Sequence, residues 1–276
     1  MRPDIADLRQ FYATPQGRLA ARLIARRMAA LRPTETNLRI LGLGYPCPFL
    51  SVLADGAERV VTFMPHEQGV GADGGAAGNR AAMVNEAMLP LPDRSVDVVL
   101  LAHAVETTDR VNRLLREVWR VLDDGGRLMA IVPNRRGLWC FAESTPFGHG
   151  KPYSASQLRE LLRTNLFDPA RRERALYVPP FKSRLWLRTG PTFERFGQRF
   201  GGQLSGVILI EAQKTTVSAT PVLADAGYGS LRVRALPMRG VAARQETGDE
   251  ALGAAAPGRP TTAARAIAFT PRRRRR

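Results

Sequence analysis

The stretch LRILGLGYPCPFL, residues 38–50, decides the fold of this chain. An apolar run rich in Leu and Ile ends at Gly42 and Gly44, and a helix-like apolar segment follows. A strand, a glycine turn and a helix in this order are typical of a parallel α/β sheet. In such a sheet the glycines let the backbone approach a ligand, and the helix start offers the ligand free N–H groups. The stretch therefore predicts a nucleotide-sized crevice after Gly44.

Strand-like and helix-like segments alternate on both sides of this stretch. Strands are expected over 38–43, 59–64, 81–84, 96–102, 127–132 and 206–211, with a further short one over 176–178. Helices are expected over 7–31 with a break near Pro15 and Gly17, then over 49–55, 107–122, 154–162 and most of 181–200. The segment 66–80 is rich in glycine and is expected to be a frayed helix or a loop. The alternation predicts one doubly wound parallel sheet.

The composition is that of a globular protein with an excess of basic residues. The chain has 276 residues and a formal net charge of +16, and residues 212–276 carry 12 basic and 4 acidic residues. Such a charge favours anionic partners such as nucleic acid. Because the rest of the excess is spread along the chain, codon usage that favours Arg and Ala explains it better. Two cysteines, no apolar signal core and no run long enough to span a bilayer predict a reducing cytoplasm.

Three regions are expected along the chain. Residues 1–33 form an N-terminal helical segment and residues 34–213 form the α/β domain. Residues 214–276 are rich in Ala, Gly, Pro, Thr and Arg and end in five arginines, so a disordered basic tail is predicted there. Such a tail can bind nucleic acid, but a passive tail is the favoured interpretation.

Between residues 38 and 160 the chain resembles the class I S-adenosylmethionine-dependent methyltransferases, and most closely their type-11 group. The residues that carry the resemblance are LPLPDRSVDVVLLAHAVE, residues 89–106, and LLREVWRVLDDGGRLMAIVPN, residues 114–134. In that family they supply a turn and the fourth strand, then a helix, a tight turn and the fifth strand. The resemblance implies a Rossmann-like sheet of seven mostly parallel strands, S-adenosylmethionine as cofactor and methyl transfer as activity.

The resemblance also implies a set of cofactor-binding residues, and this chain departs from several of them. The family's first loop has an acidic residue and then alternate glycines, whereas this chain has Gly42, Gly44, Pro46 and Pro48 there. Proline removes backbone N–H donors, so the loop is rebuilt. Met64 stands where the family has the acid that binds the ribose. The expected cofactor-binding residues are Gly42, Gly44, Tyr45, Met64, Asn85, Glu86 and Ala102.

Methyl transfer requires the protein to align the acceptor with the methyl group and to exclude water. It requires a general base only where the acceptor is protonated. The candidate catalytic residues are His103, at the end of a strand, and His149 and Tyr153, on the long linker that covers the acceptor in this family. His103 is alternatively a structural histidine that bonds a nearby loop. Glu106 is placed at the start of the next helix, where a helix-dipole role is favoured over catalysis. No metal site is expected.

Three functions remain open from the sequence. The first is a methyltransferase that acts on a small molecule. The second is a methyltransferase-like protein that has lost catalysis and serves as a binding or assembly partner, which the rebuilt first loop and the missing ribose acid favour. An RNA methyltransferase ranks third, since it rests only on net charge and the arginine tail. No G-x-G-x-x-G follows the first strand, which argues against a dinucleotide oxidoreductase.

Overall fold

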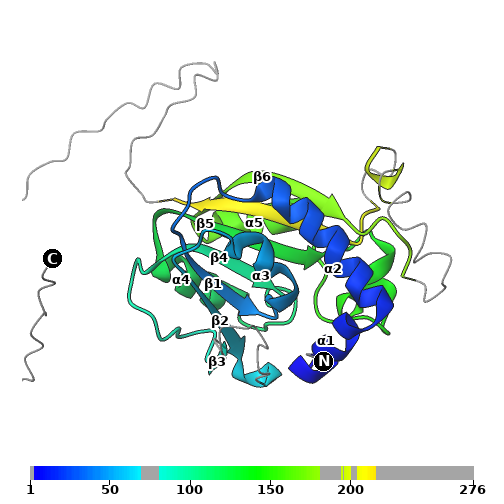
Figure 1. Ribbon diagram of the computed structural model, residues 1–276, viewed down its shortest axis with the longest axis horizontal. Coiled ribbons are helices and arrows are strands. Elements are labelled where there is room, and N and C mark those ends of the chain that lie inside the picture. The colour runs from blue at the N-terminus through cyan, green and yellow to red at the C-terminus, as the bar shows by residue number, and fades with distance from the viewer. Residues whose placement is uncertain (1–2, 70–80, 181–193, 195, 200–203, 216–276) are drawn as a thin grey trace, which may run out of the picture. The chain divides into compact units, whose positions relative to one another are not determined.

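The structure, a computed structural model, describes residues 3–69, 81–180, 194, 196–199 and 204–215 (Figure 1). Residues 1–220 form one compact unit, and among its described residues seven strands make a single sheet. The elements in chain order are α1 (Ile5–Ala13), α2 (Pro15–Met28), η1 (Ala29–Leu31), β1 (Arg39–Gly44), α3 (Cys47–Ala54), β2 (Arg59–Pro65), η2 (His66–Gln68), β3 (Ala81–Val84), β4 (Val96–Ala102), α4 (Val111–Val121), β5 (Leu122–Pro133), η3 (Leu138–Phe141), η4 (Pro146–Gly148), α5 (Ala155–Thr164), β6 (Phe167–Ala175) and β7 (Val207–Lys214).

The strand order is β3-β2-β1-β4-β5-β7-β6. Strands β1 to β5 pair in parallel, and β7 runs antiparallel to both of its neighbours. The chain order reverses between β1 and β4, which pair with Gly44 opposite Ala102. In sheets of this kind ligands bind outside the carboxyl ends of the strands at such a reversal. The expected sheet of seven mostly parallel strands is confirmed.

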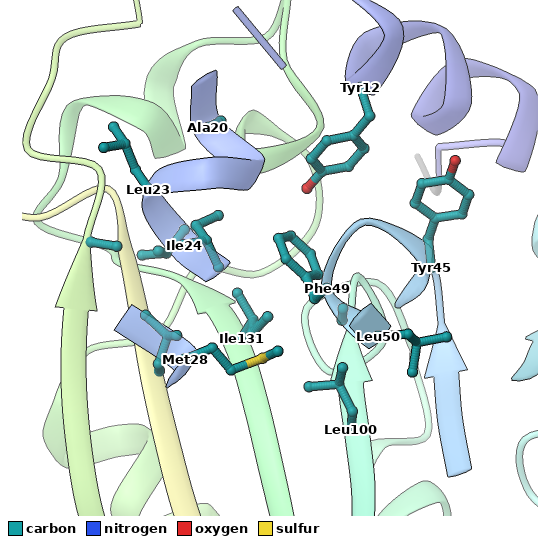
Figure 2. Close-up of a cluster of buried hydrophobic side chains, with 14 of the residues drawn as sticks. Tyr12, Ala20, Leu23, Ile24, Met28, Tyr45, Phe49, Leu50, Leu100 and Ile131 are labelled. Atoms are coloured by element: carbon teal, nitrogen blue, oxygen red, sulfur yellow. The ribbon is translucent and has the colours of Figure 1, made fainter. Parts of the chain in front are cut away.

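Helices cover both faces of the sheet. On one face, α1, α2 and α3 share an apolar core with side chains of β1, β4 and β5, such as Ile40, Leu100 and Ile131 (Figures 1 and 2). On the other face, α4 and α5 pack against the alternate residues of the same strands, such as Leu41 and Leu101. Strand β4 is therefore buried on both sides, which explains why VDVVLLA is almost entirely apolar.

Local sequence signals explain most element boundaries. Thr14 caps α2 through Gly17, so the predicted break lies one residue before Pro15. Ser154 and Gln157 form a capping box at the start of α5, which confirms the expected cap. The apolar side chains of α4 recur at helical spacing, and Leu114, Leu115, Val118 and Val121 are all buried.

Three boundary predictions were wrong. Helix α4 begins at Val111 rather than at residue 107, because residues 103–109 form turns that leave the end of β4. No strand covers 176–178; the strand is β6, Phe167–Ala175, immediately before it. Strand β5 begins at Leu122, so the predicted tight turn at 123–126 lies inside it. The helix predicted over 181–200 and the tail predicted over 214–276 lie almost entirely outside the described residues, as does most of the segment 66–80.

No helix among the described residues combines the length and the apolar character that crossing a bilayer would require.

Candidate active site

The first loop is closed against the end of β4. The Tyr45 N–H donates a hydrogen bond of 2.7 Å to the carbonyl oxygen of Ala102. Gly44 has a φ of +90°, and a Cβ at this position would overlap that same carbonyl oxygen. A Cβ on Gly42 would overlap the ring of Pro46. Both glycines are therefore required by the close approach of this chain's own backbone and loop.

A buried polar cluster lies at the carboxyl end of β4. The Tyr12 hydroxyl, from α1, lies 2.7 Å from His103 Nε2, and His103 Nδ1 lies 3.2 Å from Glu106 Oε1. Both His103 and Glu106 are 2% exposed, and Tyr12 is 8% exposed. The cluster joins a helix at the start of the chain to the turn that follows β4.

His103 is held in an unusual backbone conformation. Its φ is +53°, a region that costs a residue with a side chain about 1–3 kcal/mol and persists only where the surroundings impose it. The His103 carbonyl accepts two hydrogen bonds, from Gln68 Nε2 at 3.0 Å and from the Thr107 hydroxyl at 2.9 Å. These contacts hold the backbone of His103, whose ring nitrogens face Tyr12 and Glu106.

Several buried acceptor atoms of this cluster lack a hydrogen-bond donor. Gln68 is 1% exposed and its Oε1 has no partner, and neither carboxylate oxygen of Glu106 has a well-directed hydrogen bond. Buried polar groups are nearly always hydrogen-bonded. Several unpaired acceptor atoms at one place therefore indicate either a ligand that brings N–H or O–H groups or a proton on one of the neighbouring side chains that satisfies them. The ammonium and ribose hydroxyl groups of S-adenosylmethionine are donors of this kind.

Aromatic rings surround the cluster. Tyr12 stacks on Tyr45 with ring centroids 5.8 Å apart and meets Phe49 edge-on at 5.8 Å. The ring of Phe147, from η4, lies 5.1 Å from that of His103. Figure 2 shows the Tyr12 hydroxyl directed into the molecule beside Phe49, whereas the Tyr45 hydroxyl points the other way. These rings exclude water from His103, and burial raises the pKa of Tyr12 well above its ordinary value, with smaller contributions from Glu106 and Tyr45.

The remaining cofactor-binding predictions fall at neighbouring strand ends. Met64, near the end of β2, is buried and carries no charge. Asn85 follows β3 and is exposed, and its side chain accepts a hydrogen bond from Ala87 N. Glu86 is buried and accepts a hydrogen bond of 2.5 Å from the Thr108 hydroxyl. The end of β3 is thereby connected to the turn that follows β4.

His149 and Tyr153 lie on the linker, outside the hydrogen-bonded cluster. His149 lines a cavity of about 730 Å³ between α1 and residues 143–149, together with the carboxylates Asp4, Asp7 and Glu143. Tyr153 is half-buried, and its pKa is raised mainly by that burial and secondarily by Glu106. The linker reaches the cluster through its backbone, since Lys151 N donates to the Glu106 carbonyl at 2.7 Å.

A second open cavity, of about 710 Å³, adjoins Tyr12 on the side of the first loop. We call it the arginine groove. The described residues that line it are Arg9, Tyr12, Arg18, Ala21, Arg22, Tyr45, Cys47 and Pro48. None of these is acidic, and within the described part of the chain the three arginines form no ion pair.

The structure adds two residues to the predicted site and corrects the placement of a third. Neither Tyr12 nor Gln68 was among the predicted site residues, because both reach His103 through tertiary packing. Gln68 follows β2 by three residues, and a polar residue near that strand end was the available signal. Glu106 does not start a helix: it lies in the turn, five residues before α4, so a helix-dipole role is wrong. Across the described ranges, no group of three His, Cys, Asp or Glu side chains is placed to hold a metal ion.

Comparison with known proteins identifies the central part of the chain. Residues 41–130 match a family model described as a methyltransferase domain. The chain is 33% identical over 115 residues to the ubiquinone/menaquinone biosynthesis C-methyltransferase of Methylobacterium nodulans. It is 37% identical over 86 residues to a probable S-adenosylmethionine-dependent methyltransferase of Mycolicibacterium smegmatis. These matches cover 38% and 30% of this chain, and only 46% and 33% of the two relatives.

Solved structures share the fold at low sequence identity. A Thermotoga maritima protein described as a SAM-dependent methyltransferase, possibly a histamine N-methyltransferase, is 16% identical with a TM-score of 0.52. A putative Haloferax volcanii methyltransferase, solved in complex with the Trm112 activator, is 16% identical with a TM-score of 0.53. Each comparison covers 76% of this chain, and 96% and 98% of the respective structures. Residues 41–130 of this chain therefore match a methyltransferase domain, and its seven-stranded sheet shares the fold of these solved structures.

Proposed function

We propose that this protein transfers a methyl group from S-adenosylmethionine to a small-molecule acceptor. One observation carries the proposal: Gln68, His103 and Glu106 meet where β1 and β4 end, at the reversal of strand order, and leave buried acceptor atoms without donors. This is the place where a sheet of this topology binds its ligand. The family match over residues 41–130 supports the same reaction.

The residues present suit the polar groups of the cofactor. S-adenosylmethionine supplies an electrophilic methyl group on a sulfonium. Gln68 Oε1 would accept a hydrogen bond from its ammonium or ribose groups, in place of the acid that the sequence lacks at Met64. Asn85 and Glu86 would lie nearest the adenine. Gly42, Gly44, Tyr45 and Ala102 would form the wall of the site, with Tyr45 presenting its ring.

Of the predicted residues, His103 is the one that this site favours as a general base, because it follows the end of β4 and its two ring nitrogens face Tyr12 and Glu106. His149 and Tyr153 remain predictions for contacts with the acceptor. His149 faces a cavity large enough for a small molecule, whereas Tyr153 is packed beside Asn134 through a backbone bridge. A His149→Ala change that leaves the Michaelis constant for the acceptor unaltered would remove His149 from this role.

A second candidate function is a methyltransferase-like binding protein without catalysis. The observation that favours it is the first loop, where Pro46 and Pro48 provide no N–H donors and Tyr45 N is used by Ala102. The Haloferax volcanii relative was solved with an activator protein. A protein partner would fit either function.

Calorimetric titration with S-adenosylmethionine and S-adenosylhomocysteine separates the two candidates. A methyltransferase is expected to bind with micromolar affinity, a free energy of about −8 kcal/mol. The affinity should fall at least about tenfold in Gln68→Leu, which removes the unpaired acceptor and one charge-assisted contact. The matched control is Glu67→Leu, at the adjacent position of η2. No heat and no thermal shift at millimolar ligand would exclude the methyltransferase and leave the binding protein.

A further inference from the structure

The proton positions of the buried cluster follow from its geometry. Glu106 Oε1 lies 3.2 Å from His103 Nδ1, and the carboxylate has no other hydrogen-bond donor. An unprotonated Nδ1 would place two acceptors face to face in a buried site, which is strongly unfavourable. Nδ1 therefore carries a proton, and the lone pair of Nε2 faces the Tyr12 hydroxyl at 2.7 Å. The hydroxyl then donates its proton to Nε2.

The other groups around the imidazole do not compete for the protons at its two nitrogens. Gln68 from η2 contacts only the backbone carbonyl of His103, and Phe147 from η4 presents an uncharged ring. Tyr45 stacks on Tyr12. Because Tyr12 keeps its proton at neutral pH, it acts as a donor to His103 and not as a phenolate. The order Glu106, His103, Tyr12 is that of a base oriented by a carboxylate.

Tyr12 connects this cluster to the arginine groove. Its hydroxyl contacts His103, and Tyr12 also lines the groove, as Arg9 and Arg22 do. The three guanidinium groups of the groove lack carboxylate partners in the described chain. Arginine binds carboxylate and phosphate groups through paired hydrogen bonds, so the groove suits a ligand with an anionic group.

We infer that the arginine groove seats an anionic methyl acceptor that carries a hydroxyl group, and that Tyr12 passes the proton of this hydroxyl to His103. The inference rests on the proposed function and names its acceptor class. Only an acceptor that loses a proton on methylation needs such a base, which excludes thioethers and tertiary amines.

The proton balance of the step is complete. The acceptor oxygen bonds to the methyl carbon while the carbon–sulfur bond breaks with its electron pair on sulfur. The acceptor O–H bond breaks and its proton moves to the Tyr12 oxygen, as the Tyr12 proton moves to His103 Nε2. The imidazolium that results is stabilised by the Glu106 carboxylate. Tyr12 is the catalytic residue of this step, and His103 and Glu106 act through it.

Histidine nitrogen NMR tests the proton positions without any cofactor. The full chain has three histidines, His66, His103 and His149, so the His103→Gln variant assigns the signals. At neutral pH we expect His103 to carry its proton on Nδ1, with an unprotonated Nε2 whose shift changes in Tyr12→Phe. A neutral His103 protonated on Nε2 would overturn the inference, because it could not accept a proton from Tyr12.

Glu106 is tested by its influence on the proton position of His103. In Glu106→Gln the Nδ1 and Nε2 signals of His103 should change, and Glu106→Asp should restore part of the wild-type pattern, whereas the signals of His66 and His149 should stay as in the wild type. A purely structural Glu106 would alter stability and leave the His103 nitrogen signals in place, which would contradict its role.

Small probes test the groove. We expect 3-hydroxybenzoate to shift the His103 Nε2 signal, whereas phenol lacks the anion and benzoate lacks the hydroxyl, so both should have much weaker effects. The double variant Arg9→Gln, Arg22→Gln should weaken 3-hydroxybenzoate binding by about tenfold or more, since it removes two charge-assisted contacts. Arg113→Gln, exposed on α4, is the matched control. Equal binding by the double variant would overturn the groove as the acceptor site.

Failure of this inference is distinguishable from failure of the proposed function. If S-adenosylmethionine binds but His103 carries its proton on Nε2, the methyltransferase stands and the relay is wrong. A different result is that neither S-adenosylmethionine nor S-adenosylhomocysteine binds, while His103 carries its proton on Nδ1 and 3-hydroxybenzoate binds in the groove. In that case the groove is a binding site on a protein without methyl transfer, and the assignment of its ligand as a methyl acceptor is wrong.

Discussion

Gly44 and Gly125 share a positive φ but differ in their surroundings. Gly44 has φ +90° and lies against the Ala102 carbonyl, whereas Gly125 has φ +78° and no atom within 4 Å of a Cβ position. We expect Gly125→Ala to lower the free energy of unfolding by about 1 kcal/mol, from backbone strain alone. Gly44→Ala adds steric overlap and should cost roughly 3 kcal/mol. Urea unfolding of both variants measures the difference.

The Gly44→Ala and Gly125→Ala variants also test whether the first loop is held closed against β4. Equal losses of stability in the two variants would show that the first loop moves away from β4 at little cost. A loop of that kind would be open to a ligand, and the close contact between Gly44 and Ala102 would not be a fixed feature of the site.

At the scale of elements, Arg39 joins three strands. At the start of β1, its guanidinium bonds Asp97 of β4 at 2.6 Å and Asp123 of β5 at 2.8 Å. The hydrogen bond from Arg39 is the main reason that the pKa of Asp97 lies below its ordinary value. The three side chains hold the amino ends of the parallel strands in register.

The pH dependence of this network has a definite sign. Because the folded-state pKa of Asp97 is lowered, the ion pair stabilises the fold above the unfolded pKa of about 3.9, and the stabilisation is lost as the pH falls through the folded-state value. Arg39→Gln should therefore cost roughly 1–2 kcal/mol at pH 7 and progressively less below pH 4. Urea midpoints across pH 3–7 test this, with exposed Arg59→Gln as the control. A pH-independent loss would assign the effect to packing.

The corner between α1 and α2 sets the position of Tyr12. A Cβ on Gly17 would overlap the Phe11 carbonyl and approach the Tyr12 backbone. Gly17→Ala should therefore push α1 away from α2, cost about 2 kcal/mol of stability and lengthen the Tyr12–His103 hydrogen bond. Urea unfolding and the His103 Nε2 shift report the two effects. An unchanged Nε2 shift would show that α1 is held by contacts other than this corner.

Elements with a strong apolar pattern were predictable from sequence, and amphipathic edge elements were not. Strands β1 and β4 and helix α4 have sequence patterns that only one structure satisfies. Strand β6, FDPARRERA, contains Pro169 and several charges, which are typical of an edge strand but also of a surface loop. It became a strand because β7 pairs with it, and that partner is distant in the sequence.

At the scale of the molecule, the N-terminal helices are part of the main core. Residues of α1 and α2, including Leu8, Ile24 and Met28, are fully buried or nearly so in the cluster that contains Phe49 and Leu100. Removal of residues 1–31 should therefore expose apolar surface, abolish cooperative thermal unfolding and increase binding of a hydrophobic dye. Calorimetry and dye fluorescence measure this. A sharp transition in the truncated chain would show that these helices dock late and are dispensable.

The site was predictable from sequence only where it lies on the sheet. Ala102 ends a strand that the motif identifies and His103 follows it, so their place at the carboxyl edge of the sheet followed from topology. Tyr12 reaches His103 across 91 positions of sequence and Gln68 reaches it across 35, and no local pattern encodes such contacts. The same holds for the arginine groove, whose members come from helices α1, α2 and α3 and from Tyr45.

The position of β7 has a consequence for synthesis of the chain. Strand β7, Val207–Lys214, lies between β5 and β6, which are both made before it. At a typical translation rate, about 4–16 s separate the end of β5 from the end of β7. During that interval the nascent polypeptide displays an unpaired edge along β5, at Leu128–Val132, where another unfinished chain can pair. Ribosome-associated chaperones should therefore protect this protein most while residues 134–206 emerge.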